Sequence, residues 1–467
     1  MPHLSDEVAY TLQARLFAHG LRVGPPADNP SMLAYPFWQT SPHSFSIFPP
    51  GWPALLALGE AIGLPWLVNP LLAAALPPLT FLLAQTLTER PKAWLAAAIV
   101  ALSPGVLILA ASRMAHTSVL VALLGLAVVV ARREDPLWAW ALAGLGAAYT
   151  VLARPFDAAT VAGPLLALGL WRAPDWPRRT PLLLLPALAS ALTLWDNHQL
   201  TGHALSFPVN PWYEAWTDFQ RPGCNALGFG PQIGCHPTLG SLGHTPQKAM
   251  KLAFLALTRM DRLTLGLPGG LLLALPGLLL LRPRRLSAAL LGLVIGGYAL
   301  YWSPGAAYGA RFYHALYLLL PIWLAVGLHR FLGRGAWLLV LLMPLAGLNV
   351  VQRDLSEDYW CVDGELRSLL KDNGVTEGVV FLQARGNRKV AWPALGVESF
   401  TCDAMLEAGE GFALDDPTHR RGGLQVRHAL PDAESTSYFL DHFHPGAPAW
   451  LVQHDIATDS FHLIRLR

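Results

Sequence analysis

Apolar runs of about 14 to 22 residues recur between residues 66 and 351, separated by short breaks that are charged or rich in proline and glycine. A helix that crosses a bilayer needs roughly 17 to 25 predominantly apolar residues. The pattern therefore predicts an α-helical polytopic membrane protein with about ten transmembrane helices. The predicted spans are residues 66–87, 94–111, 118–130, 137–153, 158–171, 182–195, 263–281, 286–302, 312–328 and 336–351.

The composition agrees with a chain that lies in a bilayer. Hydrophobic residues make up 53% and charged residues 14% of the 467 residues, whereas a soluble domain carries roughly a quarter charged residues. The mean hydropathy is +0.38. No Walker motif and no Rossmann glycine fingerprint occur in the sequence, which disfavours ATP-driven transport and direct use of a nucleotide sugar.

Positive charge is unevenly distributed over the short loops between the predicted spans. Alternate loops carry the basic clusters Arg90/Lys92, Arg132/Arg133, Arg172/Arg178/Arg179, Arg282/Arg284/Arg285 and Arg330/Arg334. Because short cytoplasmic loops retain lysine and arginine during insertion, we predict that these loops are cytoplasmic. The outer face then receives the N-terminal segment, the long loop 196–262 and everything after residue 351.

This arrangement predicts three regions. Residues 1–65 form an outer-face loop with juxtamembrane helices, residues 66–351 form the multi-span domain, and residues 352–467 form a soluble domain outside the membrane. No signal peptide or span carries residues 1–51 across the membrane. We therefore expect either a spanning helix encoded upstream of residue 1 or insertion of this tail by the first helical hairpin.

Two surface helices are predicted in the N-terminal region. Val8, Leu12 and Leu16 form one apolar stripe with polar residues elsewhere, so this helix is expected to lie along the membrane. Residues 52–62 are apolar but too short to span a bilayer, and we interpret them as a second surface or re-entrant helix.

The C-terminal region changes character after residue 351. Charge rises, and the short β-like segments GVVFLQ, PAWLVQH and FHLIRL lie between turns. Its roughly 115 residues suffice for one small core, and we predict a small α/β fold. The stretch DDPTHRRGG is interpreted as a solvated turn rather than a phosphate-binding loop.

All four cysteines fall in segments that are predicted to face the outside, where an oxidising compartment permits disulfides. Cys224 and Cys235 bracket the glycine- and proline-rich stretch NALGFGPQIG. This spacing suits a small loop closed by a disulfide, and free buried thiols are the alternative.

Three short loops on the predicted outer side each carry a single arginine. They are SRMAHT with Arg113 and His116, RPFD with Arg154 and Asp157, and SPGAAYGARFYH with Arg311 and His314. These arginines oppose the positive-inside trend, and a guanidinium offers paired donors to phosphate oxygens. We predict an anion site at the membrane surface. Interfacial snorkelling, or a structural ion pair between Arg154 and Asp157, is the alternative.

The segments HLSDEVAYTLQARLFAHG, FPPGWPALLALG, SRMAHTSVL, ARPFDA and YGARFYHALYLLLP together resemble the polytopic glycosyltransferases of the GT-C class. The resemblance is strongest to bacterial relatives of the protein O-mannosyltransferases and the lipid A aminoarabinose transferases. It covers residues 2–351 in the same order.

The resemblance implies an inverting transfer of a sugar from a polyprenyl-phosphate-linked donor to a hydroxyl of a glycan, lipid or protein acceptor. It implies a bacterial inner (plasma) membrane location, with the active site and the C-terminal region on the periplasmic face. Membrane lipids are the other expected partners, and no nucleic acid is expected.

The resemblance also implies roles for individual residues. Asp6 would be the general base that removes the acceptor proton, or would help to hold a divalent cation, and Glu7 would orient Asp6. Arg311 is the first choice for the cation that holds the departing phosphate. The further candidates for phosphate binding are Arg154, Arg113, His116 and Tyr313.

Two features depart from the family pattern. The first transmembrane helix, which normally anchors the loop with the acidic pair, has no counterpart in this sequence. No acidic motif other than Asp157 occurs in the short outer loops, and no His/Asp/Glu cluster has metal-ligand spacing. No metal site is therefore predicted, and a divalent cation remains an open cofactor.

Two other functions fit parts of the pattern. A transporter or flippase of a lipid-linked saccharide could use the same arginines to hold phosphate. Transporters usually carry charges near the midplane and show inverted repeats, whereas here the charges cluster at one rim. The third hypothesis is an inactive relative, which would bind lipid without transferring a sugar.

Overall fold

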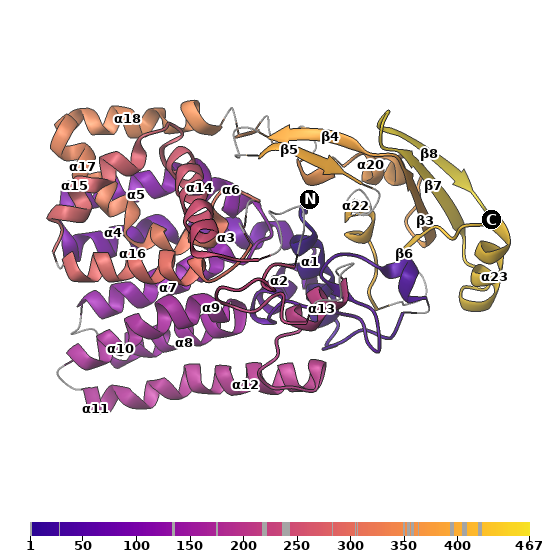
Figure 1. Cartoon of the computed structure of the whole chain (residues 1–467), viewed down its shortest axis with the longest axis horizontal. Coiled ribbons are helices and arrows are strands. Elements are labelled where there is room, and N and C mark those ends of the chain that lie inside the picture. Colours follow the sequence, from indigo (N-terminus) through magenta and orange to yellow (C-terminus); the bar gives the residue numbers. More distant parts are fainter. Residues whose placement is uncertain are drawn as a thin grey trace. The chain divides into compact units, whose positions relative to one another are not determined.

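A computed structural model gives the architecture of the chain (Figure 1). The structure describes residues 2–27, 29–132, 136–173, 176–216, 222–235, 243–282, 284–303, 305, 307–348, 351–352, 355, 359–362, 364–392, 397–403, 409–418 and 423–467. Arg133 and residues 419–422 of the DDPTHRRGG stretch lie outside the described residues.

The chain forms two compact units. Unit 1 comprises Met1–Phe48, Pro53–Val68 and Gln352–Arg467, and unit 2 comprises Pro49–Trp52 and Asn69–Val351. The N-terminal and C-terminal segments, which the sequence pattern treats as separate regions, therefore belong to one unit.

Unit 1 contains a four-stranded sheet in the order β6-β3-β7-β8. Its strands are β3 (Gly378–Arg385), β6 (Leu424–His428), β7 (Ala449–Asp455) and β8 (Ser460–Arg465). β3 pairs in parallel with both β6 and β7, with Val380 opposite Val426 and Trp450, and β8 pairs antiparallel with β7. The three β-like segments of the sequence are thus confirmed as β3, β7 and β8, whereas β6 was not anticipated.

The remaining elements of unit 1 surround this sheet or connect to it. They are α1 (Ser5–Ala18), η1 (Pro30–Leu33), β1 (Trp38–Gln39), β2 (Phe45–Ser46), η2 (Pro65–Leu67), η9 (Tyr359–Cys361), α20 (Glu365–Asp372), β4 (Arg388–Trp392), β5 (Val397–Cys402), α22 (Gly409–Phe412) and α23 (Ala433–Phe443). β1 and β2 form an antiparallel pair, as do β4 and β5.

The apolar stripe of α1 faces the core of unit 1. Val8, Leu12 and Leu16 are buried in one cluster with Val380 of β3 and Val452 of β7. The helix predicted to lie along the membrane therefore covers apolar residues of the C-terminal strands instead. The local pattern identifies the apolar face of a helix but not the distant segment that buries it.

Unit 2 is helical, and α2 (Gly51–Ala61) and α3 (Val68–Ala73) connect it with unit 1 in sequence. Its α-helices are α4 (Leu76–Leu87), α5 (Arg90–Leu102), α6 (Pro104–Ala111), α7 (His116–Arg132), α8 (Leu137–Ala153), α9 (Pro155–Asp157), α10 (Gly163–Arg172), α11 (Trp176–Arg179), α12 (Leu184–Thr201), α13 (Val209–Trp216), α14 (Pro246–Leu265), α15 (Gly270–Leu280), α16 (Arg284–Ala299), α17 (Leu320–Leu332) and α18 (Ala336–Met343). Its other helical turns are the π-helices η3 (Ala158–Ala162) and η8 (Pro344–Leu348) and the 3-10 helices η4 (Thr180–Leu183), η6 (Arg311–Leu318) and η7 (Gly333–Gly335).

These helices pack against partners that are both near and distant in sequence. α8 contacts α7 and α12, α4 contacts α5 and α7, and α17 contacts α15 and α5. Figure 1 shows α7, α8, α10 and α12 side by side, with α14 crossing the general direction of the helices.

Two helices among the described residues are long and apolar enough to cross a membrane, Pro65–Leu87 and Leu320–Leu348. The total is four if each bent pair is one span, namely Arg90–Leu102 with Pro104–Ala111 and Pro246–Leu265 with Gly270–Leu280. Shorter apolar helices are His116–Arg132, Leu137–Ala153 and Ser287–Ala299. The membrane character of the chain is supported, and the count of ten spans remains a prediction.

Several predicted spans have a different local structure from the one expected, and two of them bear on the site. The span 312–328 begins with the 3-10 helix η6, and its α-helical part starts only at Leu320. The span 263–281 is broken after Leu265, where Gly266 adopts a φ of +75° and ends α14. Glycine tolerates this left-handed conformation, which commonly ends a helix.

Each unit contains one disulfide. Cys224–Cys235 lies in unit 2, which confirms the predicted small loop, and Cys361–Cys402 lies in unit 1. The second pairing was not anticipated, because the sequence pattern does not bring residues 41 positions apart together.

Candidate functional site

The three loops with single arginines, which the sequence predicts to face the outer side, converge within unit 2. α8 ends at Ala153, Arg154 leaves the helical conformation with φ −148°, and Pro155 starts α9. Proline suits a first helical position because its missing N–H is not needed there. This short break brings Arg154 and Asp157 into contact one turn apart.

Asp157, Arg154 and Tyr298 form a closed triangle of hydrogen bonds. The Arg154 Nε donates to Asp157 Oδ2, and the Arg154 Nη2 donates to the Tyr298 hydroxyl at 2.8 Å. The Tyr298 hydroxyl donates in turn to Asp157 Oδ1 at 2.8 Å. The Asp157 side chain is fully buried and that of Arg154 is 15% exposed. The structural ion pair that the sequence left open is therefore present.

The triangle sets the charge state of Asp157. Burial by itself would raise the pKa of Asp157. The Arg154 guanidinium, His314 and the hydrogen bonds from Arg154 and Tyr298 outweigh this effect, so the pKa lies below its ordinary value. Asp157 is thus an anion at neutral pH, and it holds Arg154 in place.

Two buried histidines lie next to the triangle. The Nε2 atom of His314 is 3.9 Å from Asp157 Oδ2, which is too long for a hydrogen bond, and its Nδ1 lies 3.0 Å from the Arg311 carbonyl oxygen. The His116 ring meets the His314 ring edge-on, with centroids 4.8 Å apart. Neither ring nitrogen of His116 has a hydrogen-bond partner among the described residues.

Arg311 and Arg154 flank one aromatic ring. The guanidinium carbon of Arg311 lies 5.4 Å from the centroid of the Phe312 ring, and that of Arg154 lies 5.8 Å from the same centroid. Phe312 stacks on Tyr298 at 5.3 Å, and the buried Tyr313 ring is 5.7 Å from Tyr298. Cation–π attraction favours both cations beside this ring.

The Arg113 loop is tied to the same group through its backbone. The Arg113 carbonyl accepts a hydrogen bond from the Trp52 Nε1 at 2.7 Å, and Asn69 Nδ2 donates to the Ser112 and Met114 carbonyls at 2.6 and 2.9 Å. Met114 Sδ is 3.9 Å from the Nη1 of Arg311. The 113–116 loop and the 311–314 segment are therefore neighbours.

The structure thus brings four predicted residues into one group, which we call the loop cluster: His116, Arg154, Arg311 and Tyr313. The backbone of the Arg113 loop adjoins this group through Met114. The loops that carry it contribute three arginines and one carboxylate, Asp157, so the cluster is suited to an anion. Sequence reasoning missed Tyr298 and Phe312, which organise it. A tyrosine inside an apolar run was the available signal, because polar groups there are often functional.

The acidic pair lies in unit 1, at the start of α1. The Oε2 atom of Glu7 accepts hydrogen bonds from the backbone nitrogens of His3 at 2.8 Å and Leu4 at 3.0 Å. Glu7 is fully buried, whereas Asp6 is partly exposed. Glu7 therefore caps the helix whose first turn carries Asp6.

His3 joins this turn to the C-terminal segment of unit 1. Its Nδ1 lies 3.1 Å from the Val362 carbonyl oxygen. Burial lowers the pKa of His3, and the nearby Glu7 carboxylate offsets this only in part. The first residues of the chain are thereby held by Glu7 and by Val362.

A protein-built metal site does not form among the described residues. No three His, Cys, Asp or Glu side chains come together there in a way that could hold an ion. Asp6 would need ligands from other sources to bind a divalent cation, so no metal is assigned to it.

Comparison with known proteins finds structural similarity only at low sequence identity. No family model and no curated protein matches this sequence. Three solved structures do match: the apo oligosaccharyltransferase of Archaeoglobus fulgidus (14% identity, TM-score 0.35), AglB of the same organism with an inhibitory peptide and a dolichol-phosphate (11%, 0.34), and apo ArnT of Cupriavidus metallidurans (12%, 0.30).

The three matches cover most of this chain but not all of each neighbour. They cover 95%, 94% and 96% of this chain and 55%, 54% and 88% of the respective neighbours. The chain thus spans about half the length of the two oligosaccharyltransferases. TM-scores below 0.5 carry no conclusion about this chain, so the proposal below rests on its own residues.

Proposed function

We propose that this protein is a membrane glycosyltransferase that moves a sugar, with inversion, from a polyprenyl-phosphate-linked donor to an acceptor hydroxyl on the outer face of the membrane. The observation that carries the proposal is the loop cluster, in which Arg154 and Arg311 flank one ring and Asp157 fixes Arg154. A cationic group with buried aromatic neighbours suits a lipid-linked phosphate.

In the proposed reaction the acceptor oxygen attacks the anomeric carbon. The bond between this carbon and the phosphate oxygen breaks, and its electron pair leaves with the phosphate. The acceptor proton passes to the Asp6 carboxylate. Glu7 is a positioning residue, because its hydrogen bonds to His3 and Leu4 hold the first turn of α1.

The loop cluster supplies the positive charge for the departing phosphate. Arg311 is the principal ligand in this proposal, and Arg154, Arg113, His116 and Tyr313 assist it. Asp157 keeps Arg154 oriented and offsets only part of the positive charge.

The location follows from the same proposal. The loop cluster and residues 352–467 face the periplasm, and the chain lies in a bacterial inner membrane. The acceptor is a glycan, lipid or protein that presents a hydroxyl to this face.

Binding of the donor phosphate is tested with polyprenyl phosphate and purified protein in detergent. Arg311→Ala is expected to weaken saturable binding about tenfold or more, because a charge-assisted hydrogen bond contributes about 1.5 to 3 kcal/mol. The matched control is Arg330→Ala, which removes an exposed arginine at the end of α17. Equal affinity of a folded Arg311→Ala and the unchanged protein would refute the phosphate site.

The role of Asp6 is tested by sugar transfer. Folded Asp6→Asn is expected to lose transfer from a panel of polyprenyl-phosphate-linked sugars while it retains polyprenyl phosphate binding. The matched control is Asp372→Asn, which changes an exposed aspartate at the end of α20. Full transfer by Asp6→Asn would remove Asp6 as the base.

A further inference from the structure

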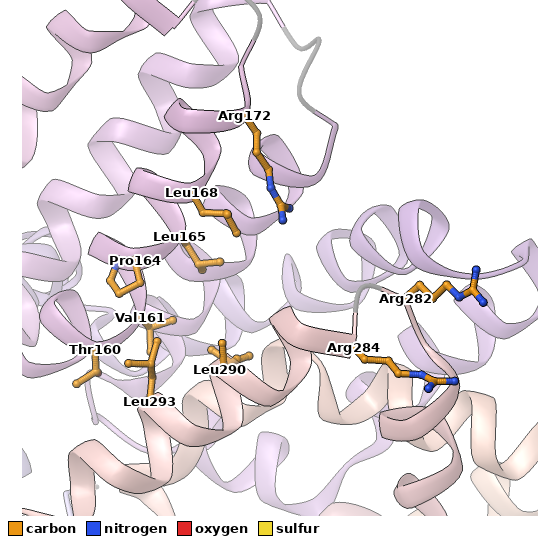
Figure 2. A pocket seen from close by; sticks show the side chains of 11 residues that line it. Thr160, Val161, Pro164, Leu165, Leu168, Arg172, Arg282, Arg284, Leu290 and Leu293 are labelled. Atoms are coloured by element: carbon orange, nitrogen blue, oxygen red, sulfur yellow. The ribbon is translucent and has the colours of Figure 1, made fainter.

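A cavity of about 600 Å³ lies between α10 and α16. Figure 2 shows its two walls: residues from Thr160 to Leu168 follow one helix, and Leu290 and Leu293 follow the facing one. A volume of several hundred Å³ is typical of a small-molecule site. Apart from Thr160 and the arginines, the lining is apolar.

Three arginines gather toward one end of this cavity. Arg172 is the last residue of α10, Arg284 is the first residue of α16, and Arg282 precedes α16 (Figure 2). A second cavity of about 170 Å³ shares Arg172, Arg282, Leu165 and Leu290 with the first. Arg172 and Arg282 therefore line both cavities, whereas a basic loop that only directs membrane insertion does not need to line a cavity.

The arginine end is distinct from the loop cluster. Thr160 lies close in sequence to Asp157, whereas Arg172 is twelve residues further along the same helical stretch. At a rise of 1.5 Å per residue this separation is roughly 18 Å. One lipid phosphate cannot contact both groups, so the arginine end needs a ligand of its own.

We propose that the cavity binds an anionic diacyl phospholipid, with its phosphate at the end lined by Arg172, Arg282 and Arg284 and its acyl chains along Leu165 and Leu290. Apolar walls without charge suit hydrocarbon, and guanidinium groups at one end suit a phosphate. Basic pockets between spanning helices on the cytoplasmic side recognise anionic head groups in this way. The sequence predicts the cytoplasmic side for these arginines.

The ligand is a structural lipid rather than the sugar donor. Its head group lies at the predicted cytoplasmic end, whereas the proposed donor phosphate lies at the loop cluster. Loss of this lipid is therefore expected to leave polyprenyl phosphate binding unchanged. A failure of the lipid proposal can thus be distinguished from a failure of the proposed donor site.

Native mass spectrometry of delipidated protein titrated with phosphatidylglycerol or phosphatidylcholine of equal chain length tests the inference. The unchanged protein is expected to bind phosphatidylglycerol at least about tenfold more tightly. Arg172→Gln and Arg284→Gln are each expected to reduce this preference severalfold. Arg330→Gln, at an arginine outside the cavity, is expected to keep it.

A variant that preserves every charge separates the cavity from insertion topology. Leu293→Trp adds bulk at a lining position that is 40% exposed and is expected to reduce phosphatidylglycerol binding. The matched control is Leu272→Trp, at an exposed leucine of α15 that does not line the cavity. Equal binding of both lipids by the unchanged protein, or unchanged preference in Leu293→Trp and Arg172→Gln, would overturn the proposal.

Discussion

Asp157 joins Arg154 of the loop cluster to Tyr298. Its carboxylate is fully buried and accepts hydrogen bonds from Arg154 and Tyr298. A buried charge without a partner is costly, so each of these contacts depends on the others.

A double-mutant cycle measures this dependence. Asp157→Leu is expected to destabilise unit 2 by about 3 to 5 kcal/mol, because it leaves the largely buried Arg154 without its counter-charge. Arg154→Met combined with Asp157→Leu is expected to recover part of this loss, since both charges are then absent. Thermal unfolding in detergent reports both effects. A double variant as unstable as the sum of the single changes would contradict the coupling.

The same pair predicts a pH dependence. The pKa of Asp157 is lower in the folded protein than in the unfolded chain. Its contribution to stability is therefore complete above the unfolded value of about 3.9 and is lost as the pH falls through the folded value. Below about pH 4, the melting temperature of the unchanged protein should fall more steeply than that of the Arg154→Met/Asp157→Leu variant. Parallel curves would exclude this role for Asp157.

The sequence suggests the contact between Arg154 and Asp157 but neither of the two contacts made by Tyr298. The i,i+3 spacing of Arg154 and Asp157 indicates an ion pair as one of the alternatives. Tyr298 is 141 residues from Asp157, and no local spacing relates them. Glu7 is similar: its position in the acidic pair suggests chemistry, whereas its hydrogen bonds show a helix cap.

At the scale of elements, glycines determine how closely α15 and α17 approach. A Cβ atom at Gly327 of α17 would overlap with the carbonyl oxygen of Leu273, and one at Gly277 of α15 would overlap with that of Trp323. Small residues commonly permit such close backbone contact between membrane helices.

This contact gives a prediction for helix packing. Gly327→Ala is expected to destabilise unit 2 by about 1 to 3 kcal/mol, because the obstructing atom belongs to the backbone and not to a flexible side chain. Gly125→Ala is the matched control in α7, where a Cβ would meet nothing within 4 Å, and it should be neutral or slightly stabilising. Melting temperatures of the two variants in one detergent make the comparison. Equal effects would show that the close approach does not limit packing.

The observed ends of the helices show how well the apolar pattern of the sequence predicts local structure. Apolar runs predict the helices of unit 2 well where a run is uninterrupted, as in α7 and α8. They do not identify the 3-10 helix η6, because an apolar run indicates a helix without distinguishing 3-10 turns from the α-helical turns that follow. That tighter segment carries Arg311 and Tyr313 of the loop cluster, and His314 next to them.

At the scale of the whole molecule, unit 1 is assembled from the two ends of the chain. Val8 and Leu12 share a core with Val380 and Val452, and the Cys361–Cys402 disulfide lies in the same unit. Changes near the N-terminus are therefore expected to affect the stability of the C-terminal sheet.

The two disulfides are expected to stabilise the folded protein. Protein exported to an oxidising compartment is expected to show no free thiol without reductant. Replacing Cys361 and Cys402 by alanine should lower the free energy of unfolding by about 4 kcal/mol, and replacing Cys224 and Cys235 should lower it by about 3 kcal/mol. The first effect is larger because the longer loop gains more entropy in the unfolded chain when its disulfide is removed. Thiol quantification and thermal unfolding measure these quantities. Four reactive thiols in the unreduced protein would place these segments in a reducing compartment.

The sequence by itself determined the features that depend on neighbouring residues: apolar helices, three of the four strands of the main sheet, the Cys224–Cys235 loop and the three loops with single arginines. Helix and strand periodicity and short loop spacing are local properties. Only the tertiary structure decided that α1 covers the C-terminal strands, that Tyr298 joins Asp157, and that Arg172 and Arg284 meet at one cavity. These contacts join segments far apart in the chain, and the burial of apolar surface that selects them is not directional.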